Sequence, residues 1–201
     1  MRATRLAGVF AAAMLGALTA EEAKPAVYTV EGGKLASITV RSVTDLEDIV
    51  TTTNAVTGSI TCDRAKGTGS VSLTVKADTL DTGIPARNGH LQGEPWLDTA
   101  KFPEIRFQST SVKHLKGDAY EITGDFSMRG VTKPVTAQAE VRFRDDEKAL
   151  KAFGGPAVKA TATFSIKLSD FGVKAQGIGL KVSDSLDISL SDFGVDKSKA
   201  K

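Results

Sequence analysis

Two histidines and one cysteine are the side chains of this chain with the widest chemical scope, and their spacing suits neither metal binding nor nucleophilic catalysis. His90, His114 and Cys62 stand far apart in the sequence. Zinc sites draw three or four ligands from closely spaced Cys and His residues. The Gly-x-Ser-x-Gly pattern that exposes a nucleophilic serine does not occur either. We therefore expect no metal site, no catalytic residues and no enzymatic activity.

Cys62 cannot form an internal disulfide, because it is the only cysteine of the chain. Two interpretations stay open for its thiol. It is either a small apolar side chain buried beside Ile60, or a free thiol that pairs with a second chain.

The first twenty residues have the pattern of a secretory signal peptide. Arg2 and Arg5 precede an apolar run over residues 6–18, which ends in the small residues Thr19 and Ala20. The run is shorter than the ~20 residues that span a bilayer as a helix. We predict a signal peptide over residues 1–20, one domain over residues 21–201, and a periplasmic or secreted location.

Charge gives no indication of a nucleic-acid partner. Removal of Arg2 and Arg5 lowers the number of Lys and Arg from 26 to 24, which equals the 24 Asp and Glu. The two signs are interspersed, apart from a Lys-rich C-terminal tail that we expect to be disordered. The chain lacks both a basic stripe and a glycine-rich loop leading into a long helix. Neither nucleic acid nor a nucleotide is therefore an expected ligand.

Alternation of apolar and polar residues dominates the remaining chain. Residues 70–77 and 158–168 alternate throughout, as do residues 135–143. A period of two predicts strands with one apolar and one polar face. Further strands are expected near residues 27–31, 35–42, 56–62, 104–114, 119–128 and 186–190. Residues 126–143 read as an antiparallel hairpin broken by Gly130 and Pro134.

About eight or nine such strands must bury their apolar faces, either between two sheets or inside a closed barrel. A barrel of eight strands has an interior that side chains fill or that holds one small ligand. Many inward positions are small, which favours a cavity over a packed interior, although composition leaves both open. These positions are Ala77, Gly124, Ala137, Ala139, Ala160 and Ala162. A short helix is expected over residues 87–98, and a loop over residues 145–156.

Three sequence blocks carry a family resemblance. They are His90-Leu91 with Trp96-Leu97-Asp98 and residues 101–110; Phe126-Ser127-Met128-Arg129-Gly130; and Ser169-Asp170-Phe171-Gly172-Val173 with Val182-Ser183-Asp184. In this order and spacing they resemble the YceI-like family of secreted, lipocalin-like proteins that bind polyisoprenoids. The resemblance covers residues 28–190 and is weaker before Gly58. The Ser-Asp-Phe-Gly-Val motif recurs at residues 191–195, where the family pattern does not expect it.

The resemblance implies an all-β, antiparallel, eight-stranded lipocalin-like barrel that carries a long apolar ligand without enzymatic activity. The ligand would be a polyisoprenoid, an isoprenoid quinone or a related lipid, with no other cofactor. Two alternatives remain: a secreted structural or partner-binding barrel, and an isoprenoid-modifying enzyme. A homodimer and transient contact with a membrane also stay open.

The candidate ligand-binding residues come from the inward faces of the strands and from the expected helix. They are Val71, Leu73, Val75, His90, Trp96, Ile105, Phe107, Phe126, Met128, Ala160, Ala162 and Phe164. His90 is expected either to contact a ligand head group at the cavity mouth or to hydrogen-bond the backbone. Trp96 is expected to cover one end of the barrel. Arg129 is expected to form an ion pair near the hairpin turn, for example with Asp170.

Overall fold

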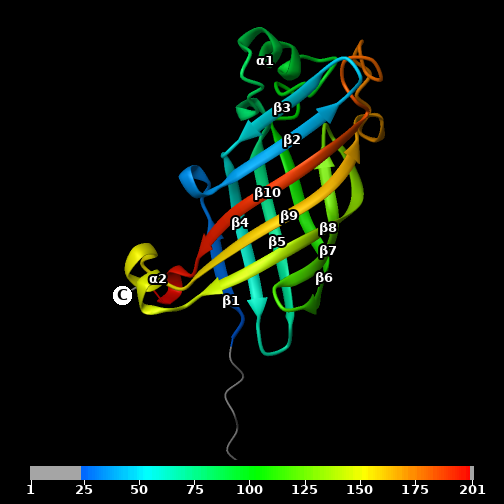
Figure 1. Cartoon of the computed structure of the whole chain (residues 1–201). Helices are drawn as coiled ribbons and strands as arrows, with labels where there is room; N and C mark the ends of the chain where they lie inside the picture. Colours follow the sequence, from blue (N-terminus) through cyan, green and yellow to red (C-terminus); the bar gives the residue numbers. More distant parts are fainter. Residues whose placement is uncertain (1–23, 200–201) are drawn as a thin grey trace, which may run out of the picture.

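The computed structural model describes residues 24–199 and shows an antiparallel β-barrel with a short helix near each end (Figure 1). The strands are β1 (Ala26–Val30), β2 (Ser37–Val43), β3 (Asp48–Thr53), β4 (Val56–Asp63), β5 (Thr68–Lys76), β6 (Glu104–Lys116), β7 (Ala119–Met128), β8 (Val131–Arg144), β9 (Ala157–Lys167) and β10 (Ser185–Val195). The helices are α1 (Pro85–Gln92) and α2 (Glu147–Phe153), and the 3-10 helices are η1 (Gly33–Leu35), η2 (Ala77–Thr79), η3 (Leu168–Phe171) and η4 (Lys197–Lys199).

Eight of these strands close the barrel, in the order β1-β4-β5-β6-β7-β8-β9-β10, and β10 returns to β1. The closing pairs are Thr29 with Val195 and Val30 with Gly194. Closure removes the free edges that an open sheet would expose to other chains. The predicted eight-stranded antiparallel barrel is confirmed.

The hairpin of β2 and β3 extends the wall on one side. β10 pairs with β2 over residues 187–191 before it reaches β1, so the hairpin lies beside its first half, towards α1 (Figure 1). β3 was not predicted from the sequence, because its buried positions are Ile49, Thr51 and Thr53 and two of these are polar. Backbone hydrogen bonds of 2.8 and 2.9 Å between Thr52 and Asp81 cover part of its outer edge.

The hairpin of β7 and β8 turns at Arg129 and Gly130, as the sequence block around Met128 suggests. Both residues have positive φ, 54° and 76°, which a two-residue type I′ turn requires. The sequence predicts that the second strand starts after Pro134, but β8 already starts at Val131. A proline fits here because β8 pairs with β9 only from Gln138 onward, which leaves that side of Pro134 without a ladder partner.

The repeated six-residue sequence adopts two different structures. In the first copy residues 168–171 form η3, which ends at Gly172 in the left-handed conformation, whereas residues 190–195 lie within β10 and pair with β9. Sequence identity over six residues does not determine structure when the strand partners differ. The recurrence is therefore no structural repeat.

Two predictions about helices need correction. α1 begins at Pro85 and ends at Gln92, so it is earlier and shorter than the expected residues 87–98. The segment expected to be a loop contains α2, whose N-cap Asp146 accepts a hydrogen bond from the Ala149 amide at 3.1 Å and whose end is capped by Gly154. The sequence contains both caps, Asp146 and Gly154, but the charged residues and the Gly-Gly-Pro sequence around them are typical of a loop.

The ends of the chain bear on two further predictions. The expected signal peptide lies outside the described residues. In the C-terminal tail, Lys197 forms an ion pair with Glu31 and belongs to η4, and the predicted disorder of the tail stays a prediction. Within residues 24–199, no helix is both long and apolar enough to span a membrane.

Candidate functional site

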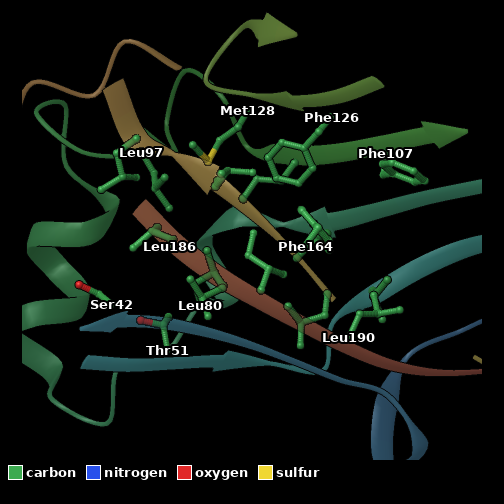
Figure 2. A pocket seen from close by; sticks show the side chains of 18 of the residues that line it. Ser42, Thr51, Leu80, Leu97, Phe107, Phe126, Met128, Phe164, Leu186 and Leu190 are labelled. Atoms are coloured by element: carbon green, nitrogen blue, oxygen red, sulfur yellow. The ribbon is translucent and has the colours of Figure 1, made fainter. Parts of the chain in front are cut away.

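The barrel encloses an apolar cavity of about 510 Å³ that runs along its interior from the α1 end. Figure 2 shows its middle, where Phe126 and Phe164 from β7 and β9 point into the same space and Phe107 from β6 lies beyond them. The rings of Phe126 and Phe164 meet edge to face, with centroids 5.7 Å apart. A volume of this size falls within the range of about 300–1,000 Å³ typical of ligand pockets.

All twelve candidate residues lie on the cavity wall. They are Val71, Leu73 and Val75 on β5, His90 on α1, Trp96 after it, Ile105 and Phe107 on β6, Phe126 and Met128 on β7, and Ala160, Ala162 and Phe164 on β9. The strand residues share one face because successive side chains of a strand alternate between inside and outside. Their position is therefore a structural finding, whereas their contact with a ligand belongs to the proposal below.

The interior is hollow and not packed, because several side chains that point inward are still accessible to solvent. Phe107, Phe164 and Leu190 face the cavity but are only partly buried. In a packed barrel, inward side chains would exclude water almost completely. The small side chains of Ala137 and Ala139 on β8, the neighbour of β9, leave space on the wall. Of the two interiors that composition left open, the cavity is the one observed.

The sequence did not identify several parts of the wall. β2 and β3 contribute Ile38, Val40 and Ile49, and the segment after η2 contributes Leu80. Ser42 and Thr51 add polar atoms near α1 (Figure 2). The row Leu186, Ile188, Leu190 and Asp192 lines the cavity along β10. The strand expected from the sequence ends at residue 190, whereas β10 continues to Val195 and so includes Asp192.

Exposed polar residues surround the mouth of the cavity at the α1 end. His90 and Lys181 are exposed members of the wall, and Arg87 of α1 forms an ion pair with Glu47 from the β2–β3 turn. Trp96 is partly buried at the same end and packs against the core, as expected for an aromatic that covers a barrel end. Within the described chain, the ring of His90 makes no hydrogen bond, so the expected bond to the backbone is not observed.

The three family blocks meet at this end of the barrel. The Arg129 guanidinium donates one hydrogen bond to the Gly172 carbonyl and a second, of 2.7 Å, to the Glu94 carbonyl. Phe102 packs on Gly130, where a Cβ atom would lie 2.7 Å from its ring. The expected ion pair of Arg129 with Asp170 is wrong. Arg129 instead donates to backbone carbonyls of two neighbouring loops, one after α1 and one after η3.

The far end of the barrel is closed by packed side chains. The centroids of the Tyr28 and Phe143 rings lie 5.8 Å apart, and the Arg64 guanidinium carbon lies over the Phe143 ring, 4.7 Å from its centroid. Val30 and Val158 are fully buried in this layer. The cavity therefore has a mouth at one end and a floor at the other.

Titratable groups inside the barrel are few. Burial raises the pKa of Asp192 to about 6, opposed by its hydrogen bond from the Phe193 amide. Burial also raises the pKa of the Cys62 thiol, against the lowering effect of Arg64. Cys62 is only partly buried and packs against the core. Residues 24–199 hold no cluster of three potential metal ligands. Serine hydroxyls donate hydrogen bonds to carboxylates at Ser165, Ser169 and Ser198, none of which lines the cavity.

Sequence comparison assigns the family. A family model described as the YceI-like domain matches residues 27–192. The chain belongs to the YceI-like family. Protein YceI of Escherichia coli O157:H7 is 40% identical over 104 residues, which are 52% of each chain. A UPF0312 protein of Photorhabdus laumondii is 38% identical over 119 residues, 59% of each chain. The matched segment thus spans little more than half the length of these curated relatives.

Solved structures with the same fold are more distant in sequence. BcnA of Burkholderia cenocepacia superposes with a TM-score of 0.69 at 20% identity, covering 79% of this chain and 95% of that one. A polyisoprenoid-binding domain from Saccharophagus degradans superposes with a TM-score of 0.62 at 14% identity, covering 86% and 99%. At these identities the likeness establishes the barrel fold.

Proposed function

We propose that this protein is a non-enzymatic carrier that holds a long apolar lipid, a polyisoprenoid or an isoprenoid quinone, inside its barrel. The observation that carries the proposal is the apolar cavity of about 510 Å³, open at the α1 end and closed at the other. A purely structural or partner-binding barrel has no need of an unfilled interior. The polyisoprenoid-binding domain of Saccharophagus degradans, which shares the fold, supports the choice of ligand class.

The walls of the cavity favour recognition of a tail over recognition of a head group. Each buried CH₂ group contributes about 0.8 kcal/mol, so a five-carbon isoprene unit contributes roughly 3 kcal/mol. One neutral hydrogen bond contributes only about 1 kcal/mol net. Several isoprene units in contact with the wall therefore outweigh one polar contact at the mouth.

Membership of the YceI-like family and the N-terminal sequence pattern support a periplasmic or secreted carrier. In such a compartment the protein would shield an insoluble tail from water. The exposed mouth, with His90 and Lys181 on its rim, is where the lipid would enter and leave. Transient contact with a membrane and dimer formation are compatible with this role but are not required by it.

Native mass spectrometry of the protein purified without detergent from its own host tests the proposal. We expect a complex heavier than the polypeptide by the mass of one lipid, and fragmentation should release a polyisoprenoid or quinone. Protein in which Trp replaces Ala162 serves as a control for lipid bound outside the barrel. A wild-type protein free of lipid that also fails to take up isoprenoids in vitro would rule out the carrier.

A further inference from the structure

Asp192 lies near the closed end of the cavity. In the strand register it stands opposite Ala160 on β9, which in turn stands opposite Val141 on β8, and all three line the cavity. One step further along the same strands, Phe143 pairs with Val158 and belongs to the packed floor. The carboxyl group therefore lies next to the packed floor, towards the closed end of the cavity.

The surroundings of Asp192 leave half of its carboxyl group without a partner. Its residue is 1% exposed, and Oδ1 accepts a hydrogen bond of 2.8 Å from the Phe193 amide. Across residues 24–199 no group pairs with Oδ2, and this atom is accessible to water neither from outside nor from the cavity. A ligand therefore meets Oδ2 only after the carboxyl group turns towards the cavity that Asp192 lines. An unpaired buried carboxyl group is unfavourable for folding.

A comparison within the same part of the chain makes Asp192 stand out. Asp196 is also buried, at 2% exposure, but its Oδ1 accepts hydrogen bonds from the amide and hydroxyl of Ser198. The other inward residues of β10 are Leu186, Ile188 and Leu190, so an aliphatic side chain would suit the row at position 192. A carboxyl group with a free oxygen in this place is accounted for if a ligand supplies the missing partner.

A partner that is both a donor and an acceptor suits either protonation state of this carboxyl group. Burial raises the pKa of Asp192 to about 6, so near neutral pH the group is close to exchanging its proton. A hydroxyl group can accept from the protonated carboxyl and donate to the ionised one. A carboxylate head group would place a second negative charge beside Asp192, which is unfavourable in an apolar interior. Between Asp192 and the mouth, the row on β10 is aliphatic: Leu190, Ile188 and Leu186.

We propose that Asp192 anchors the hydroxyl end of a long-chain isoprenoid alcohol, which enters the barrel head first and leaves its tail towards α1. The assignment rests on the proposed carrier function and adds the ligand's orientation and end group. The tail lies along β10 and β9, past Leu190 and Phe164, and its far end reaches the mouth near Trp96. Polar selection then occurs at the floor and not at the exposed His90.

Binding of three probes that share a C20 isoprenoid tail tests the proposal: geranylgeraniol, its methyl ether and the corresponding carboxylic acid. Quenching of Trp96, the only tryptophan of the chain, reports occupancy of delipidated protein at pH 7.5. We expect the wild type to bind the alcohol at least fivefold more tightly than the ether or the acid. The preference should persist in Asp192→Asn and disappear in Asp192→Leu, while the exposed Asp187→Asn on the same strand should behave as the wild type.

The outcomes separate the anchor from the carrier. Equal affinity of the wild type for alcohol and ether overturns the anchor and leaves the carrier standing, and this comparison needs no variant. An unchanged preference in a folded Asp192→Leu protein, checked by circular dichroism, overturns it as well. Failure of all three probes to bind the wild type overturns both the carrier and the anchor.

Discussion

The guanidinium of Arg129 donates a hydrogen bond of 2.7 Å to the carbonyl oxygen of Glu94, which joins the β7–β8 turn to the segment after α1. The same side chain reaches the carbonyl of Gly172 at the end of η3. One residue in a turn therefore holds two loops at the mouth of the cavity. The three sequence blocks that indicated the family are in contact through this residue.

Replacement of Arg129 by Lys should destabilise the fold, because one ammonium group cannot reach both carbonyl oxygens as the planar guanidinium does. Loss of hydrogen bonds from a charged donor to partly buried carbonyls costs about 1.5–3 kcal/mol. Urea denaturation of the delipidated protein measures the loss.

Arg142→Lys is the matched control for Arg129. Arg142 contacts Asp118 and Glu140 on the exposed surface of β8, where ion pairs contribute about 1 kcal/mol or less. Equal losses of stability in the two variants would show that Arg129 does not hold the loops.

Replacement of Ala162 by Trp should block the cavity and leave the fold intact. Ala162 is an inward, only partly buried residue in the middle of β9, so the larger side chain has room to enter the cavity. We expect isoprenoid affinity to fall at least tenfold, with a change of less than about 1 kcal/mol in the free energy of unfolding. In a packed interior the same substitution would cost about 1–3 kcal/mol.

Thr163→Trp places the same side chain on the exposed outer face of the same strand. It should bind lipid as the wild type does, measured by native mass spectrometry with a fixed excess of geranylgeraniol. If Ala162→Trp binds as well as Thr163→Trp, this face of β9 does not contact the ligand.

Asp192 should make the stability of the empty barrel depend on pH. Its pKa of about 6 lies above the ordinary value of 3.8, so the folded state favours the protonated form. The contribution is complete below pH 4 and is lost as the pH rises through 6, which amounts to about 3 kcal/mol. Asp192→Asn stays neutral, so its stability relative to the wild type should increase by up to this amount between pH 4 and pH 7.5.

Urea titrations of the delipidated wild type and Asp192→Asn at the two pH values measure the effect. Asp187→Asn, on the outer face of β10, controls for loss of a surface charge. A stability difference between wild type and Asp192→Asn that does not change with pH would mean that Asp192 is solvated.

The sequence was sufficient to predict the barrel, because the apolar faces of its strands alternate over long runs such as residues 158–168. The same alternation predicts the inward face of ten strand residues that line the cavity, whereas His90 and Trp96 came from the expected helix. β3 escaped prediction because Thr51 and Thr53 occupy its inward positions, which removes the apolar signal. α2 escaped because the charges and glycines around it resemble a loop, although Asp146 and Gly154 cap it.

Contacts between distant segments were beyond the reach of sequence patterns. The partners of Arg129 are backbone carbonyls. Every residue has a backbone carbonyl, so the sequence does not indicate which ones Arg129 contacts, and it suggested an acidic side chain, Asp170, instead. Asp192 follows an aliphatic row on β10. Its burial results from closure of the barrel, which the sequence pattern of one strand does not show. Periodicity predicts which face of a strand a residue occupies. Which residues of other strands lie at the same height in the barrel can be known only from the register of the strand pairs.

The dependence of affinity on tail length tests the carrier most directly. Quinones that share one head group and differ by single isoprene units are titrated against the delipidated wild type and His90→Ala, with Trp96 fluorescence as the signal. Affinity should rise with each unit and level off once the tail fills the cavity, by less than the roughly 3 kcal/mol per unit of full transfer because ordering the tail costs entropy. His90→Ala should change affinity less than tenfold. A flat series, together with a loss of more than tenfold in His90→Ala, would contradict the account and indicate a polar site at the mouth.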